Sequence, residues 1–146
     1  MGLFTSFDIS ASGMSAQRLR SDIISQNIAN VNSTNTGNGE PYRRKTVVFS
    51  EKSPMSFGDV LMSTAGTIGS GVKVTSIVED HETPMSMVYD PAHPDADENG
   101  YVTYPNVNVV TEMTNLIDAS RSYEANVTAF NTSKSMAVKG LEIGQN

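Results

Sequence analysis

The sequence contains no cysteine among its 146 residues. This absence excludes disulfide bonds, thiolate catalysis and zinc sites built on cysteine. No stretch reaches the roughly 18 consecutive apolar residues of a membrane-spanning helix, so no membrane insertion is expected. Residues 1–12 hold neither lysine nor arginine, and the N-terminus therefore does not match a standard secretory signal. If the chain leaves the cytoplasm, we expect a route that needs no cleaved signal peptide.

Apolar residues are also scarce, at 38% of the chain. Typical soluble domains contain roughly 45–50%, a figure that also counts glycine. The length suits one domain, but there is little apolar material for a large private core. We therefore expect the chain to complete its burial against a partner. The formal net charge of −6 disfavours non-specific binding to nucleic acids and to anionic membranes.

The N-terminal segment, residues 1–34, is predicted to be a long helix. Thr5 and Ser6 offer capping hydroxyls ahead of Asp8, and no proline interrupts the chain from there to Val31. Apolar residues recur at helical spacings, although the stripe that they form shifts register twice. The residues of this helix assigned to an assembly interface are Leu19, Ile23, Ile24, Ile28 and Val31.

The C-terminal segment, residues 106–146, carries a more regular pattern. From Val109 to Leu141, ten positions follow alternating steps of four and three, and all but Ser120 and Lys134 are apolar. A seven-residue repeat sustained this long predicts a helix with a narrow seam that faces another helix. Asn108 is expected to cap its start. The residues assigned to the assembly interface are Val109, Met113, Leu116, Tyr123, Val127, Phe130, Ala137 and Leu141.

The middle of the chain, residues 35–105, is predicted to be a small β-rich insert with mobile loops. Short strands are expected at Thr46–Phe49, Val72–Val78 and Tyr101–Tyr104. The expected fold class is therefore α+β, with long terminal helices in a coiled-coil-like bundle and this insert between them. Gly66, Gly69 and Gly71 precede a strand instead of a helix, so they lack the context of a phosphate-binding loop.

The acidic segment Asp95–Gly100 matches the first half of an EF-hand calcium loop. The twelfth position of that loop is Asn106, where a bidentate glutamate is required. We therefore favour an acidic turn closed by the Asn-Gly dipeptide. His81 and His93 lie near acids and can be imagined in a metal or acid–base site, but a solvated histidine is the ordinary outcome in such loops. No catalytic residue, metal or cofactor is expected.

The one basic cluster is Arg43-Arg44-Lys45. It can be read as a nucleic-acid contact or as a source of local ion pairs, within the chain or between subunits. The acidic net charge and the isolation of the cluster favour ion pairs.

Several stretches of the sequence resemble the family of flagellar rod and hook proteins. In that family, the motif at Ile24–Thr34 closes the N-terminal helix. The likeness is to the proximal rod type C in particular at Gly39–Lys45 and Tyr89–Val102. Three further segments resemble the C-terminal helix of that type: Pro105–Met113, Ser122–Asn126 and Lys139–Gly144.

The resemblance implies a structural subunit, not an enzyme, that assembles through its terminal helices into the periplasmic drive shaft around the export channel. Implied partners are copies of itself, other proximal and distal rod proteins, the membrane-ring–rod adaptor and the flagellar type III export apparatus. Two alternatives remain open. One is a secreted helical adhesin or effector that shares the export route, and the other is a small metal-dependent enzyme using His93, Asp95 and Asp97.

Overall fold

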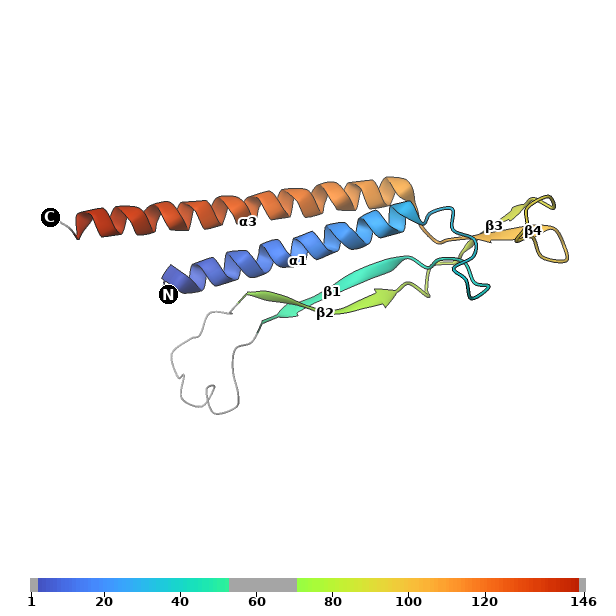
Figure 1. The fold of residues 1–146 in the computed structure, drawn as a ribbon, viewed down its shortest axis with the longest axis horizontal. Coiled ribbons are helices and arrows are strands. Elements are labelled where there is room, and N and C mark those ends of the chain that lie inside the picture. The colour runs from blue at the N-terminus through green and yellow to red at the C-terminus, as the bar shows by residue number, and fades with distance from the viewer. Residues whose placement is uncertain (1–2, 53–70, 145–146) are drawn as a thin grey trace, which may run out of the picture. The chain divides into compact units, whose positions relative to one another are not determined.

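The computed structural model describes residues 3–52 and 71–144, in which two long helices lie at the two ends of the sequence and four strands between them (Figure 1). This arrangement confirms the expected α+β class. Two of the three glycines that the sequence analysis placed before a strand, Gly66 and Gly69, lie outside the described residues. The elements are α1 (Leu3–Ala29), β1 (Lys45–Glu51), β2 (Val72–Glu79), β3 (Ser86–Tyr89), β4 (Tyr101–Tyr104) and α3 (Val109–Ile143).

The ends of both helices follow from local hydrogen bonds. Asn108 caps α3 as predicted, because its Oδ1 accepts a hydrogen bond from the Thr111 N–H at 3.2 Å, which satisfies one of the free donors of the first turn. Helix α1 begins at Leu3 and ends at Ala29, so it ends before the last residues of the segment 1–34 that the sequence predicted to be a helix. The Val31 N–H bonds to the Ile28 carbonyl at 3.3 Å, a tighter turn that closes the helix.

The strands form two separate two-stranded sheets, β1 with β2 and β3 with β4. The second is antiparallel, and its register pairs Tyr89 with Tyr101 and Met87 with Thr103. Strand β3 was not predicted from the sequence. It is only four residues long and exposed throughout, so it lacks the alternation of buried and exposed residues that identifies a strand.

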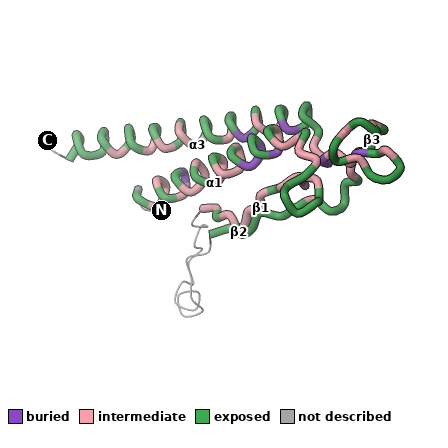
Figure 2. Tube along the Cα trace, turned by 45° about the vertical axis from the view of Figure 1, so that its right-hand side comes forward, coloured by how far each residue is buried: buried purple, intermediate pink, exposed green. Residues whose placement is uncertain are grey.

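The structure divides into two units, and each draws on both helices and on the insert. The first unit comprises Met1–Leu19, Phe49–Thr75 and Ala119–Asn146, and the second comprises Arg20–Val48 and Ser76–Asp118. The predicted segment boundaries at 34/35 and 105/106 stay a prediction. Among the described residues, buried side chains gather in the second unit (Figure 2). They are Ile23, Ile24, Asn27, Tyr42, Val102, Pro105, Asn106 and Glu112.

In the first unit the two helices are antiparallel and approach closely. The rings of Phe7 and Phe130 lie 4.9 Å apart, and farther along α1 the side chain of Asn126 lies against Gly13. A Cβ added to Gly13 would meet Asn126 Oδ1 at 2.5 Å, so a larger residue at position 13 would displace the Asn126 side chain. The Val72 N–H donates to Ser12 Oγ at 3.1 Å, which joins β2 to α1.

The isolated chain is expected to be much less stable in the C-terminal part of α3 than in the second unit. No described residue from 120 to 144 is buried, and amphipathic helices gain little without tertiary packing. Hydrogen exchange of the unassembled chain should be faster over 120–143 than over 109–118 by on the order of tenfold or more. Equal protection along the whole of α3 would contradict this expectation.

Candidate functional site: a buried polar cluster and an exposed apolar stripe

A buried polar cluster lies in the second unit and is defined here as Asn27, Tyr42, Arg44, Asn106 and Glu112. Glu112 and Asn27 are completely buried. Glu112 Oε1 accepts a hydrogen bond from Arg44 Nε at 2.9 Å and Oε2 accepts one from Asn27 Nδ2 at 2.8 Å. Arg44 Nη2 is also 2.9 Å from Oε1. The buried carboxylate is therefore paired and hydrogen-bonded, as burial of a charge requires.

Asn27 uses the full hydrogen-bonding capacity of its amide. Its Oδ1 accepts from Tyr42 Oη and from the Lys45 N–H, both at 2.9 Å. Its Nδ2 donates to the Lys45 carbonyl at 2.9 Å in addition to Glu112. The side chain thus pairs with both backbone groups of Lys45, as a neighbouring strand would. Asn27 fixes the end of α1 against the start of β1.

Asn106 plays a similar part for the loop after β2. Its Oδ1 accepts from the Arg44 N–H at 2.9 Å, and its Nδ2 donates to the carbonyls of Asp80 at 2.9 Å and Thr83 at 3.2 Å. The Asp80 N–H in turn donates to the Arg44 carbonyl at 2.8 Å. Arg44 therefore joins three segments: the chain just before β1, the loop after β2, and the residues around Asn106 that lead into α3.

Two residues of the basic cluster, Arg44 and Lys45, form ion pairs within the chain, which is one of the two kinds of ion pair that the sequence left open. Arg44 pairs with Glu112 and lies 3.9 Å from Asp80, while Lys45 Nζ lies 3.7 Å from Glu79 Oε1. Burial raises the pKa of the Tyr42 phenol, and the carboxylates of Glu79 and Glu112 raise it further. Tyr42 therefore stays neutral and keeps its hydrogen bond to Asn27 at neutral pH.

Acid is expected to weaken the loop after β2. Hydrogen bonds from the backbone and side chain of Thr83 hold the pKa of Asp80 below its ordinary value of 3.8, and Arg44 contributes a smaller part. Ionised Asp80 thus stabilises the fold fully above pH 3.8, and this contribution is lost as the pH falls through the lowered pKa. Between pH 5 and pH 2, the urea midpoint should fall less in Asp80→Asn than in the unmodified chain. The exposed Asp118→Asn should behave like the unmodified chain, and an identical fall in all three would contradict the assignment.

The residues of α1 assigned to the assembly interface are partly used within the chain. Ile23 is 6% exposed and Ile24 5% exposed, so both belong to the core of the second unit. Leu19, Ile28 and Val31 are half-buried.

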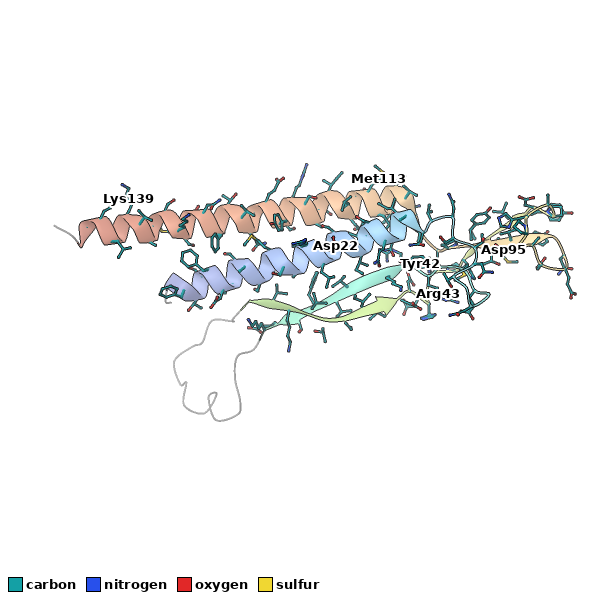
Figure 3. The ribbon with its side chains drawn as sticks, in the orientation of Figure 1. Asp22, Tyr42, Arg43, Asp95, Met113 and Lys139 are labelled. Atoms are coloured by element: carbon teal, nitrogen blue, oxygen red, sulfur yellow. The ribbon has the colours of Figure 1, made fainter. Side chains whose placement is uncertain are left out.

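Half of the eight α3 residues assigned to that interface are left exposed. These four define the apolar stripe: Val109, Met113, Tyr123 and Leu141, which are 37%, 55%, 40% and 71% exposed. Met113 is labelled in Figure 3, on the outer side of α3. Leu116, Val127, Phe130 and Ala137 are half-buried, and Phe130 contacts Phe7. The heptad pattern did not include five further exposed apolar residues of α3: Val110, Ile117, Met136, Val138 and Ile143.

The contact of α3 with α1 is offset from the apolar stripe. In the second unit the buried contact residue is Glu112, next to Met113, and in the first unit Asn126 lies against Gly13, next to Val127. The one α3 residue of the first unit that is buried is Ala119. Small and polar residues therefore make much of the contact within the chain, and much of the apolar surface remains open.

The acidic segment forms a turn closed by its own hydrogen bonds. Asp97 Oδ1 accepts from the N–H groups of Asn99 and Tyr101 at 2.9 and 2.8 Å. Asp95 accepts from Thr34 Oγ1 at 2.7 Å and from Asn35 Nδ2 at 3.4 Å, and these bonds lower its pKa. Within 3–52 and 71–144, no group of three or more His, Cys, Asp or Glu side chains is placed to hold a metal ion.

The helices of the described region include none that is long and apolar enough to cross a membrane.

The sequence did not identify the buried polar cluster as a unit, because its members lie up to 85 residues apart, as in the bond from Asn27 to Glu112. The one available signal was Glu112 itself, an acid beside the apolar seam in the first turn of α3.

Comparisons with known proteins match nearly the whole chain. Residues 7–35 match the family described as "Flagella basal body rod protein", and residues 98–143 match "Flagellar basal body rod FlgEFG protein C-terminal". The flagellar basal-body rod protein FlgC of Borreliella burgdorferi is 47% identical over 99% of both chains. FlgC of Bacillus subtilis is 48% identical and that of Salmonella typhimurium 43%, each over 99% of this chain and 100% of the relative. The resemblance to rod proteins is confirmed.

Proposed function

Because the chain belongs to the family of flagellar basal-body rod proteins, we propose that it is a structural subunit of the proximal rod that assembles through its terminal helices. The observation that carries this proposal is the apolar stripe. Val109, Met113, Tyr123 and Leu141 are exposed, while small and polar residues make much of the helix contact within the chain. Exposed apolar surface of this kind is typical of protein interfaces.

The stripe suits a shaft that transmits torque. Its seven-residue repeat allows side chains of one helix to insert between those of another, as in coiled coils. Close-packed apolar contacts of this kind resist shear because the interior of such an interface is as dense as a protein core. The buried polar cluster holds the end of α1, the start of β1 and the start of α3 in one register. Load applied to one of these elements therefore reaches the others.

The proposed partners are copies of the chain, other proximal and distal rod proteins, the membrane-ring–rod adaptor and the flagellar type III export apparatus. The proposed location is the periplasmic rod around the export channel, reached without a cleaved signal peptide. In this role the chain acts as a building block, with no catalytic residue and no cofactor. The proposal keeps Leu19, Ile28 and Val31 of α1 as contacts between subunits, together with the α3 residues.

Single introduced cysteines can test the assembly interface, because the chain has no thiol of its own. Met113→Cys and Tyr123→Cys should react readily with a maleimide in the unassembled chain and become protected in purified basal bodies. Asn38→Cys, at an exposed position in the loop before β1, provides the matched control for general access. Stripe thiols that stay as reactive in basal bodies as in the free chain would contradict the proposed interface.

A further inference from the structure

The β3–β4 hairpin presents an exposed cluster of large side chains, the tyrosine patch, defined as Met87, Tyr89 and Tyr101. The register pairs Tyr89 with Tyr101 and Met87 with Thr103, so all three lie on one face of the hairpin. Their exposed fractions are 62%, 63% and 43%. On the opposite face Val102 is completely buried. Val88, which pairs with Val102 on that opposite face, is 46% exposed, so the face with the tyrosines is the more exposed of the two.

The tyrosine patch is held in place by its own turn. The rings of Tyr89 and Tyr101 lie 5.3 Å apart in an edge-on arrangement with an interplanar angle of 66°. Tyr89 also lies against Gly100, where an added Cβ would be 2.9 Å from Tyr89 Cε2. Gly100 has a φ of 80°, which a side chain would strain. A patch that is ordered before binding loses little conformational entropy on association.

The stretch of the chain that contains the patch carries charge of one sign. Residues 74–120 contain nine Asp and Glu and no Lys or Arg, whereas the rest of the chain holds all ten Lys and Arg with seven acids. Four of the acids lie in the turn between β3 and β4: Asp90, Asp95, Asp97 and Glu98. The patch therefore has a rim of carboxylates, and its partner surface should carry lysine and arginine.

The first unit of the same chain holds six lysine and arginine residues with five acids, whereas the second unit holds four with eleven acids. The exposed basic residues of the first unit include Arg18, Lys52, Lys73, Arg121 and Lys134. Among residues 3–52 and 71–144, no ion pair engages any of these five. Lys139 differs, because its Nζ lies 2.7 Å from Glu142.

We propose that the tyrosine patch and its carboxylate rim dock onto the first unit of a second copy of this chain, where exposed lysine and arginine residues meet the carboxylates. This inference rests on the proposed rod function and adds a second contact to it. Tyrosine and methionine are enriched at protein interfaces, and the complementary charges orient the two copies. Because the two surfaces differ, the contact is head-to-tail, and such contacts build rings or helical assemblies.

A cysteine-to-lysine cross-linker tests this contact in assembled rods. Glu98→Cys places the only thiol of the chain on the rim of the patch. In purified basal bodies we expect a cross-linked dimer of this chain, in which the hairpin peptide is joined to Lys52, Lys73 or Lys134. Adding Tyr89→Ser should reduce the dimer yield by about tenfold. Adding Val78→Ser, at an exposed apolar position outside the patch, should leave the yield unchanged.

The outcomes separate this proposal from the rod function itself. If the basal bodies contain the chain but Glu98→Cys joins only to another protein or yields no dimer, the docking proposal fails and the rod function stands. A dimer whose yield does not respond to Tyr89→Ser also overturns the docking proposal. If the chain is missing from the basal bodies, both fail.

Discussion

Glu112→Ala is expected to lower the free energy of unfolding by about 3 kcal/mol. The substitution removes a completely buried carboxylate and leaves Arg44 and the Asn27 amide without their partner. Breaking a buried pair in this way costs roughly 3–5 kcal/mol. The lower end applies here because the Arg44 side chain is 25% exposed and water can solvate part of its charge. Urea unfolding followed by circular dichroism measures the loss.

Two further variants make this measurement decisive. Glu124→Ala removes an exposed acid from the same helix and should change stability by less than about 0.5 kcal/mol. Arg44→Ala combined with Glu112→Ala should cost less than the two single losses added together, because the partners act as one pair. Equal stability of Glu112→Ala and Glu124→Ala would show that the buried polar cluster does not hold the second unit together.

Met113→Asp is expected to abolish swimming without unfolding the chain. Met113 is 55% exposed in the single chain, and an acid near the start of a helix is favourable for the helix dipole, so the cost to the isolated fold is small. In an assembled rod the same carboxylate would be buried against a neighbouring helix without a partner, at a cost of several kcal/mol per subunit. Swimming assays on a strain carrying only the variant measure the effect.

The matched control for this variant is Thr114→Asp, an exposed position one residue away and off the stripe. It should support swimming, and circular dichroism of the two purified variants should be alike. Normal swimming with Met113→Asp would remove Met113 from the interface, whereas loss of swimming with both variants would show that the contact is broader than a narrow seam.

The long helices could be predicted because their signals are local. The seven-residue repeat, the Asn108 cap and the absence of proline within the C-terminal helix are all properties of neighbouring residues. Strand β3 could not be predicted, because Ser86–Tyr89 is ordered by pairing with β4 across an intervening turn. The buried polar cluster was missed for the same reason. Nothing in the spacing of Asn27, Arg44 and Glu112 shows that they meet.

The direction of the apolar stripe is the most instructive case. The repeat predicted a helix seam but left open whether that seam faces the partner helix of the same chain. In the structure, Gly13, Asn126 and Glu112 occupy positions in that internal contact, and Met113 and Tyr123 remain exposed. Composition pointed the same way, because a chain with so few apolar residues cannot place them in exposed stripes without a partner.

Deletion of the gene, with swimming scored and purified basal bodies imaged, tests the rod function most directly. The account predicts loss of swimming with rods that are absent or truncated next to the membrane ring, and recovery when the gene is restored. Normal swimming with intact rods, in a strain that carries no second copy, would contradict it.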